Sequence, residues 1–444
     1  MSRGKVPAII SSMMSLESDD TPMHIGVLLR FQIPANASST FMADLAADFR
    51  RQSDVVFPWN SRLLGRWVIK TQWQECQSVD LSHHFRQIGL PAPGGERELG
   101  VLVSRLHSQL LDMERPPWEC FLIEGLEGNG FALYIKVHRA LLDVAGGAEV
   151  LYTFLAQSKG DSEVTPPWHC CIDADSINDV PQIEAWEDPV AAATGLGKAI
   201  TRLVGAGIRR DRTLAVPYRA PRTALNGPVN RQRRFATQRY DQKTVSELTR
   251  KLGGCDDTVT LLYLCGSALR RFLKEFNALP DEPLVAAVPQ SRVYLSDFSL
   301  AFVSLASDEA DPLARYAAVD KSYRAALAHL ADVAPELRMA YSLAASAPFI
   351  ASQAAGAQPW MPAMFNLSFI NMPGPIGKRY LAGAELVALH NLSLLMPGTA
   401  LAVTSNYYDD AVSIGLIGAR DTLPHLQRVA VYMGLALEQL EASI

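Results

Sequence analysis

The chain has 444 residues, of which 48% are hydrophobic and 20% charged, the profile of a folded globular protein rather than a disordered one. This length predicts at least two domains, each large enough to bury a core of its own. The net charge of -5 gives no electrostatic reason to expect nucleic acid as a partner.

Cysteine usage and hydropathy indicate the cellular compartment of the protein. Six cysteines show neither paired metal-ligand spacing nor the pattern of a disulfide framework, so we expect free thiols in a reducing environment. We find no signal-peptide pattern near the first residue and no run of about 18 apolar residues that would span a membrane. These features predict a cytoplasmic protein.

The first half of the chain predicts strands and helices that alternate, placed by hydrophobic periodicity and turn residues. In chain order we expect a strand that ends at Phe31, a helix over 41–50, a strand over 67–73, a helix carrying Leu102, Leu106, Leu110 and Met113, a strand over 118–123, a hairpin turn over 127–130, a strand over 131–137 and a helix over 148–155. No acidic residue follows His83 and His84 at a useful spacing, so we interpret both as surface or strand-edge histidines.

The most informative stretch of the chain is VHRALLDVAGG, residues 137–147. Here His138 and Asp143 lie five residues apart, at the end of a buried strand and before a glycine pair. Loops at strand ends are where α/β proteins tend to expose reactive groups. His138 and Asp143 are therefore candidate functional residues.

A Pro-rich segment follows, over about 161–220, with a predicted helix around 199–208. This segment is either an interdomain linker with a packing helix or, because basic residues flank the helix, an interfacial helix that contacts anionic lipid. It separates a domain over 1–160 from a second one over 221–444.

The second half repeats the α/β texture. We expect a strand over 233–240, a helix over 243–252 stopped by two glycines, a long buried helix over 258–276, strands over 284–288, 300–305, 366–370, 385–389, 400–405 and 412–417, and a C-terminal amphipathic helix after Pro424.

Five ordered motifs resemble those of the bacterial wax ester synthase/diacylglycerol acyltransferase family. They are TPMHIG at 21–26, RPPWE at 115–119 with LIEGL at 122–126, LNGP at 225–228, NMPGP at 371–375 and LAGAE at 381–385. The stretch HRALLDV resembles the HHxxxDG motif of the CoA-dependent acyltransferase superfamily. The resemblance runs nearly from end to end.

The resemblance implies an α/β fold of two chloramphenicol-acetyltransferase-like domains with mixed sheets, flanking helices and an active-site tunnel between them. It implies transfer of a long-chain acyl group from acyl-CoA to a diacylglycerol or a fatty alcohol, giving triacylglycerol or wax ester, without a metal or prosthetic group. It also implies substrate contacts near Pro117, Trp118, Glu119 and Asn371, and a scaffold role for Asp143, paired with an arginine. A membrane or lipid-droplet surface would then be a peripheral partner.

The positions that depart from the family pattern are those that the resemblance places in or near the reaction site. Arg139 stands at the position of the general base, Val144 at that of a glycine, 260–261 (TL) at that of an Asn-Asp pair, and 296–297 (SD) at that of a Gly-Asn motif. A guanidinium stays protonated in proteins, so Arg139 cannot accept the hydroxyl proton. It could bind an anion or stabilise an oxyanion.

His138 is the adjacent alternative, since an imidazole titrates near neutral pH. Consecutive residues at a strand end point to opposite sides, however, so His138 is equally well interpreted as a packed histidine near Asp143. Two functions therefore remain open. The chain is an O-acyltransferase that is slow or uses His138 or the substrate for proton transfer, or it is a catalytically impaired family member that binds acyl-CoA or lipid without turnover.

Overall fold

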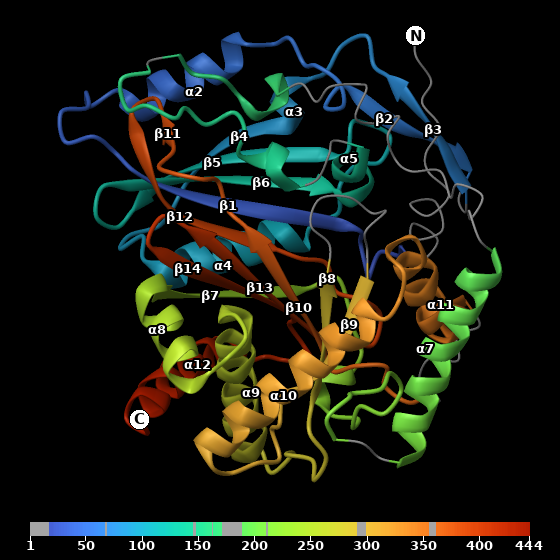
Figure 1. Ribbon diagram of the computed structural model, residues 1–444. Coiled ribbons are helices and arrows are strands. Elements are labelled where there is room, and N and C mark those ends of the chain that lie inside the picture. Colours follow the sequence, from blue (N-terminus) through green and yellow to red (C-terminus); the bar gives the residue numbers. More distant parts are fainter. Residues whose placement is uncertain are drawn as a thin grey trace.

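The computed structural model describes residues 17–66, 69–144, 148–161, 163–170, 189–209, 212–290, 299–354 and 361–444. Within these ranges the chain forms two six-stranded mixed sheets, one above the other in Figure 1, and a small two-stranded sheet. The first sheet has the order β11-β12-β1-β6-β5-β4, and the second has the order β7-β14-β13-β10-β8-β9.

The strands of the first sheet are β1 (His24–Gln32), β4 (Phe85–Gly89), β5 (Trp118–Leu126), β6 (Gly130–His138), β11 (Tyr380–Leu381) and β12 (Ala384–Leu392). Those of the second are β7 (Arg233–Asp241), β8 (Val285–Gln290), β9 (Ser299–Ser304), β10 (Leu367–Pro373), β13 (Leu401–Tyr408) and β14 (Ala411–Ala419). The small sheet pairs β2 (Ser61–Arg66) with β3 (Ile69–Glu75).

The helices are α2 (Phe41–Arg51), α3 (Leu81–His84), α4 (Glu96–Ser108), α5 (Arg139–Val144), α7 (Pro189–Arg209), α8 (Gln242–Leu252), α9 (Asp257–Glu275), α10 (Pro312–Ala331), α11 (Pro335–Ala354) and α12 (Leu426–Glu441). Helices α8, α9, α10 and α12 cover the lower side of the second sheet, and α4 lies between the two sheets (Figure 1).

Turn and capping residues fix the ends of the helices and strands that the sequence predicted well. The β5–β6 hairpin turns at Gly128 and Asn129, which both adopt positive φ, as such turns require. Helix α8 ends at Gly253, whose φ of 70° is the left-handed conformation of a helix C-cap. The long helix α9 begins where Asp256 accepts a hydrogen bond from the backbone N–H of Thr258.

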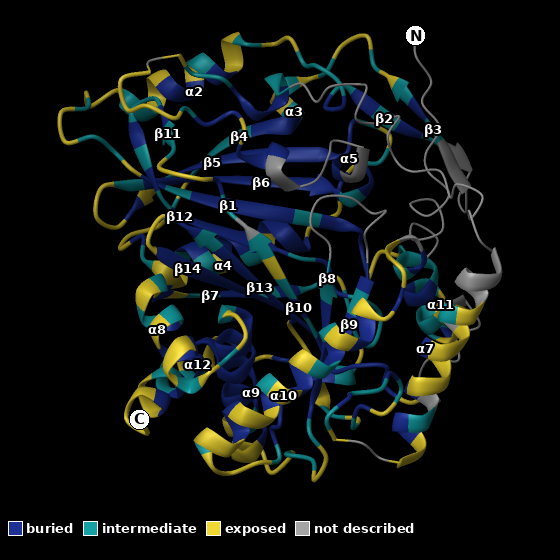
Figure 2. Cartoon of the chain, viewed as in Figure 1, coloured by how far each residue is buried: buried dark blue, intermediate teal, exposed yellow. Residues whose placement is uncertain are grey.

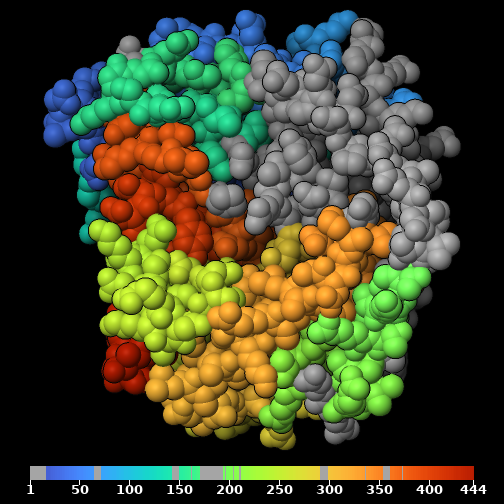
Figure 3. All heavy atoms as spheres, viewed as in Figure 1, coloured from blue at the N-terminus to red at the C-terminus, as the bar shows by residue number. Residues whose placement is uncertain are grey.

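The C-terminal half supplies part of the first sheet. Strand β12 pairs with β1 along Gly26–Gln32, and β11 continues that edge, so residues 1–160 do not complete a sheet of their own. Strand β6 pairs with one edge of β1. The other edge would expose unpaired backbone groups if β12 did not pair with it. In the space-filling view, orange and red C-terminal segments accordingly lie against the blue-green first half (Figure 3).

Buried residues gather on the sheets, while the outer faces of α8, α10 and α12 are exposed (Figure 2). One apolar cluster fills the second sheet and extends through α4 to the inner side of the first sheet. Another lies on the outer side of the first sheet, around Trp59, Trp118 and Trp168. The halves are therefore joined by a shared core as well as by β12.

Several elements differ from the prediction. The helix expected over 148–155 is a short 3-10 helix, Ala148–Leu151, and α7 is longer than the helix expected around 199–208. Our interpretation of the histidine pair was wrong for His84, which is 1% exposed. It is buried because its ring stacks on Trp118 and its Nδ1 hydrogen-bonds to the Trp118 carbonyl at 2.7 Å.

Candidate functional site

The predicted functional loop begins where β6 ends. His138 is the last residue of β6, and its backbone N–H donates to the Pro117 carbonyl at 2.9 Å. The next N–H, that of Arg139, donates to the Met23 carbonyl at 2.8 Å. The start of the loop is thus held by backbone bonds to the segments that lead into β5 and β1.

The His138 imidazole is 1% exposed and has partners on both ring nitrogens. Its Nε2 lies 3.2 and 3.3 Å from the two carboxylate oxygens of Glu17, and its Nδ1 accepts from the Ala140 N–H at 3.2 Å. This pattern places the ring proton on Nε2. The packed-histidine interpretation fits this geometry, with Glu17 as the observed partner.

Arg139 opens helix α5 and is half-buried. Asp143 and Val144 belong to the same short helix, but the structure describes only their backbone. The expected arginine partner of Asp143 therefore stays a prediction, and the glycine pair 146–147 lies outside the described residues. What the structure places at the strand end is an engaged imidazole followed by a half-buried arginine residue.

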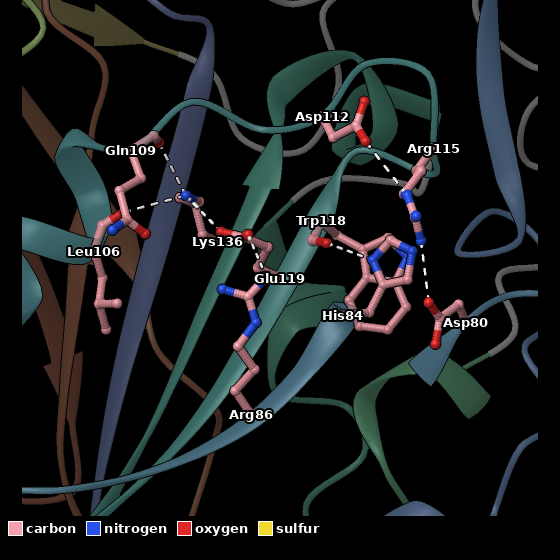
Figure 4. Close-up of polar contacts among 10 residues, drawn as sticks. All are labelled: Asp80, His84, Arg86, Leu106, Gln109, Asp112, Arg115, Trp118, Glu119 and Lys136. Carbon is pink, nitrogen blue, oxygen red and sulfur yellow. Dashed lines mark hydrogen bonds and ion pairs between the residues drawn. The ribbon is translucent and has the colours of Figure 1, made fainter. Parts of the chain in front are cut away.

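A buried ion pair lies two residues before His138 on the same strand. Lys136 is fully buried, and its Nζ lies 2.6 Å from Oε2 of Glu119. The ammonium also donates to the carbonyls of Leu106 and Gln109, at 3.1 and 3.0 Å, where α4 ends (Figure 4). A cation at a helix C-terminus satisfies carbonyls that have no intrahelical partner. Burial lowers the pKa of Lys136, and the Glu119 charge opposes that shift.

The three residues predicted near the substrate at the start of β5, Pro117 just before the strand and Trp118 and Glu119 within it, have defined structural contacts. Trp118 is 1% exposed, and its indole N–H donates to the Trp59 carbonyl at 2.7 Å. Its ring stacks on His84, whose pKa burial lowers to about 4 (Figure 4). Glu119 pairs with Lys136 and with Arg86, at 3.6 Å. Pro117 supports the loop through its carbonyl. Direct substrate contact by these residues stays a prediction.

Two further buried histidines join β1 to α4. The Nε2–H of His24 donates to the His107 carbonyl at 2.7 Å, and the His107 Nδ1 shares a hydrogen bond of 2.7 Å with the Tyr134 hydroxyl. Burial holds the pKa of both histidines well below the usual value of 6.5, with the Lys136 charge adding to the effect on His24. Both rings are therefore neutral at physiological pH.

In the second half, Asn371 lies in β10 and faces the start of α9. Its amide donates to the Thr258 hydroxyl at 3.2 Å, and its carbonyl oxygen accepts from Ser405 at 3.0 Å. The hydroxyl of Thr260 is buried and lies 2.7 Å from that of Thr249 and 3.1 Å from that of Tyr316. A polar network thus persists where the family has its Asn-Asp pair, whereas 296–297 lie outside the described residues.

Sequence reasoning missed Glu17, Lys136 and the His24–His107 pair. A lysine inside the apolar run FALYIKV was a usable signal, because a buried ammonium requires partners. No local pattern indicates Glu17, which is 121 residues from His138. In the described part of the chain no group of three or more acidic, histidine or cysteine side chains could hold a metal ion.

The helix interpreted either as a packing helix or as an interfacial lipid helix shows a mixed surface. Ala199, Leu203 and Ala206 of α7 are buried, while Ile200 and Ile208 are 43% and 75% exposed. Arg202 of α7 pairs with Asp332 at the C-terminal end of α10. Among the helices that the structure describes, none combines the length and apolar character needed to cross a bilayer.

The chain has two mixed sheets, and the C-terminal half contributes β12 to the first of them. With His138 at the end of β6, this arrangement is that of an acyltransferase-type α/β protein. A model of the wax ester synthase/diacylglycerol acyltransferase catalytic domain matches residues 8–259, and a model of the C-terminal domain of that family matches residues 296–441. The chain belongs to this family.

Individual relatives agree over nearly the whole length. The chain is 36% identical to a Mycobacterium tuberculosis protein provisionally assigned as a diacylglycerol O-acyltransferase, over 96% of this chain and 95% of that one. It is 33% identical to the O-acyltransferase WSD of Acinetobacter baylyi, over 97% and 95%. The solved wax ester synthase/diacylglycerol acyltransferase of Marinobacter aquaeolei VT8 superposes with a TM-score of 0.79 at 32% identity, over 99% of both chains. The predicted family and fold class are thus confirmed, while the tunnel stays a prediction.

Proposed function

We propose that the chain is an O-acyltransferase that moves a long-chain acyl group from acyl-CoA to a diacylglycerol or a fatty alcohol. The observation that carries this proposal is the strand–helix junction: β6 ends at His138 and α5 begins at Arg139, in a chain that matches named O-acyltransferases over nearly its full length. The products would be triacylglycerol or wax ester, and the acyl donor makes a metal or prosthetic group unnecessary.

The proposed chemistry follows from the side chains at the loop. The acceptor hydroxyl oxygen attacks the thioester carbonyl, an ester C–O bond forms, the C–S bond breaks, and the departing CoA sulfur takes up the hydroxyl proton. Arg139 supplies a fixed positive charge for the tetrahedral oxyanion. His138 positions the loop rather than removing the proton, because Glu17 and the Ala140 N–H occupy its ring nitrogens. Losing a general base typically costs about 10²–10⁴ in rate.

One observation favours a second function, that of a protein that binds acyl-CoA or lipid without turnover. No imidazole stands at position 139, and the neighbouring one is buried and engaged. The two functions separate in a direct assay, in which palmitoyl-CoA is offered with hexadecanol or with 1,2-dipalmitoylglycerol and the ester products are counted. Ester formation above the heat-inactivated control supports the transferase; binding of palmitoyl-CoA without ester supports the second function.

The proposed acceptors are lipids, so we also propose peripheral contact with a membrane or lipid-droplet surface at the cytoplasmic side. The exposed Ile200 and Ile208 on α7, near exposed Lys198 and Arg209, are the features that support such contact. Sedimentation with phosphatidylglycerol vesicles tests this, with Ile208→Ser as the variant expected to reduce the bound fraction. Equal sedimentation of both proteins would remove α7 as the contact.

A further inference from the structure

A large groove lies between α4, β7 and α12, with a volume of about 1540 Å³. Its lining is strongly basic, with two glutamates, Glu96 and Glu438, against seven arginines: Arg30, Arg97, Arg105, Arg231, Arg233, Arg234 and Arg420. The whole chain carries a net charge of -5, so the positive charge of this groove is opposite in sign to the net charge of the protein. Such a local field attracts anions.

Much of this charge is not neutralised within the protein. Arg30 pairs with Glu96, and Arg233 donates to the backbone carbonyls of Asn230 and Asp20. In the described part of the chain, no ion pair joins an acidic group to the other exposed arginines of the groove, which are Arg97, Arg105, Arg231 and Arg420. Unpaired guanidinium groups are the donors that bind phosphate most readily.

Two buried nitrogens in the lining also lack a partner. His390 is 2% exposed, and its Nδ1 has no hydrogen-bond partner among the described residues. The same holds for the buried Nε of Arg234. Buried polar atoms in native proteins are normally paired, so unpaired ones beside a cavity indicate a missing polar ligand or solvent. These nitrogens are independent of the surface arginines and indicate the same groove.

Apolar side chains border the groove. Val101 of α4, Leu110 and Val431 of α12 are 60%, 37% and 58% exposed. Large apolar groups left in solvent beside unpaired cations fit a ligand that has both anionic groups and an apolar or aromatic part. A simple inorganic anion would not use them.

The groove ends close to the functional loop. Gln109 lines the groove, and its carbonyl binds Lys136, two residues before His138 on β6. Arg233 lines the groove and binds the Asp20 carbonyl, three residues before Met23, whose carbonyl holds the Arg139 N–H. Three residues span at most about 10 Å, so Asp20, whose carbonyl holds a groove arginine, lies within about 10 Å of Met23, whose carbonyl holds the start of the functional loop.

We propose that the groove between α4, β7 and α12 binds the phosphate-bearing nucleotide of the acyl-CoA donor, and that the pantetheine arm runs from it to Arg139. This proposal rests on the proposed function only in taking acyl-CoA as the ligand. Arg231 and Arg420 hold the phosphates, and the exposed Val101 and Val431 flank the adenine. The groove thus assigns a donor-binding role to residues that no family motif contains.

Calorimetric titration with unacylated CoA tests the proposal without turnover. The double variant Arg231→Ala/Arg420→Ala removes two exposed side chains and should fold normally, and binding should weaken at least about tenfold. Arg250→Ala is the matched control, because Arg250 is an exposed arginine on α8 outside the groove, and it should bind CoA as wild type does. Pantetheine has no phosphate, so its binding should not differ among the three proteins.

Three outcomes would overturn the proposal. In the first, the double variant binds CoA as tightly as wild type. In the second, wild type does not bind CoA. In the third, the double variant loses binding to phosphatidylglycerol vesicles but keeps CoA binding, which would make the groove a lipid-headgroup site. Failure of the proposed function is distinguishable, since a protein that binds CoA through Arg231 and Arg420 but forms no ester supports the groove and excludes the transferase.

Discussion

At the scale of single residues, we expect position 139 to set the rate of acyl transfer. Arg139→His would place a neutral imidazole where the family motif has its base, so we expect acyl transfer from palmitoyl-CoA to rise at least about tenfold in kcat/KM. His138→Ala in the wild-type background is the companion variant. We expect it to change the rate little, because Glu17 and Ala140 already occupy the His138 ring.

Two results would contradict this account of the loop. A large rate loss in His138→Ala would show that His138 carries the proton. If Arg139→His binds acyl-CoA normally but gains no rate, the changes at Val144 and at 260–261 have altered the site as well. In that case the binding function replaces the transferase.

Lys136 and Glu119 form a buried ion pair in which each charge is compensated by the other. Lys136→Met leaves the Glu119 carboxylate buried without its partner at 2.6 Å, and breaking such a pair costs about 3–5 kcal/mol of unfolding free energy. Lys136→Met/Glu119→Gln removes the unpaired charge and should recover at least about 2 kcal/mol of that loss. Urea denaturation of the two variants measures both values. A double variant no more stable than Lys136→Met would show that removing the Glu119 charge relieves nothing and would contradict this account of the pair.

At the scale of elements, the His24–His107 contact between β1 and α4 should make stability depend on pH. Both histidines have a folded pKa well below 6.5, so below about pH 6.5 the unfolded chain binds protons that the folded chain does not. Stability therefore falls as pH drops, by up to about 1.4 kcal/mol per pH unit for each histidine. His107→Gln should flatten the slope of unfolding free energy between pH 7 and pH 5; an unchanged slope would exclude His107 as a contributor.

The elements that the sequence predicted well are those whose signals are local. Strand β6 is an apolar run, broken by Lys136, that follows a hairpin turn, and α8 is stopped by Gly253. Helix α10 was missed because Arg315, Ser322 and His329 lie on its buried face and interrupt the apolar periodicity.

Prediction of the candidate site was likewise limited to features with a local sequence signal. The position of the loop at a strand end followed from its neighbours in sequence, whereas the contact between His138 and Glu17 joins residues 121 positions apart. The burial of His84 likewise depends on a tertiary contact, its stacking on Trp118. Long-range partners of this kind have no local signal, so the sequence predicted where the site lies better than what holds it.

At the scale of the whole molecule, contacts between the two halves run in both directions. Helix α4 of the first half lies along β7, where the hydroxyls of Ser104 and Ser108 accept the backbone N–H groups of Phe235 and Arg233 at 2.9 and 2.8 Å. Strand β12 crosses in the other direction and pairs with β1. We therefore expect one cooperative unfolding transition for the full chain.

The exchanged strand also predicts that residues 1–160 will not fold alone. Without β12, the edge of β1 is unpaired, and the buried side chains of Leu386, Leu389 and Leu392 are lost from the two cores. Each such leucine contributes about 1.5–3 kcal/mol, and a whole domain is stable by only about 5–15 kcal/mol. Circular dichroism of this fragment should show no cooperative unfolding. A synthetic peptide of residues 378–393 should increase its ordered structure, whereas a scrambled peptide should not. A fragment that unfolds cooperatively without the peptide would show that the contiguous first half is a domain after all.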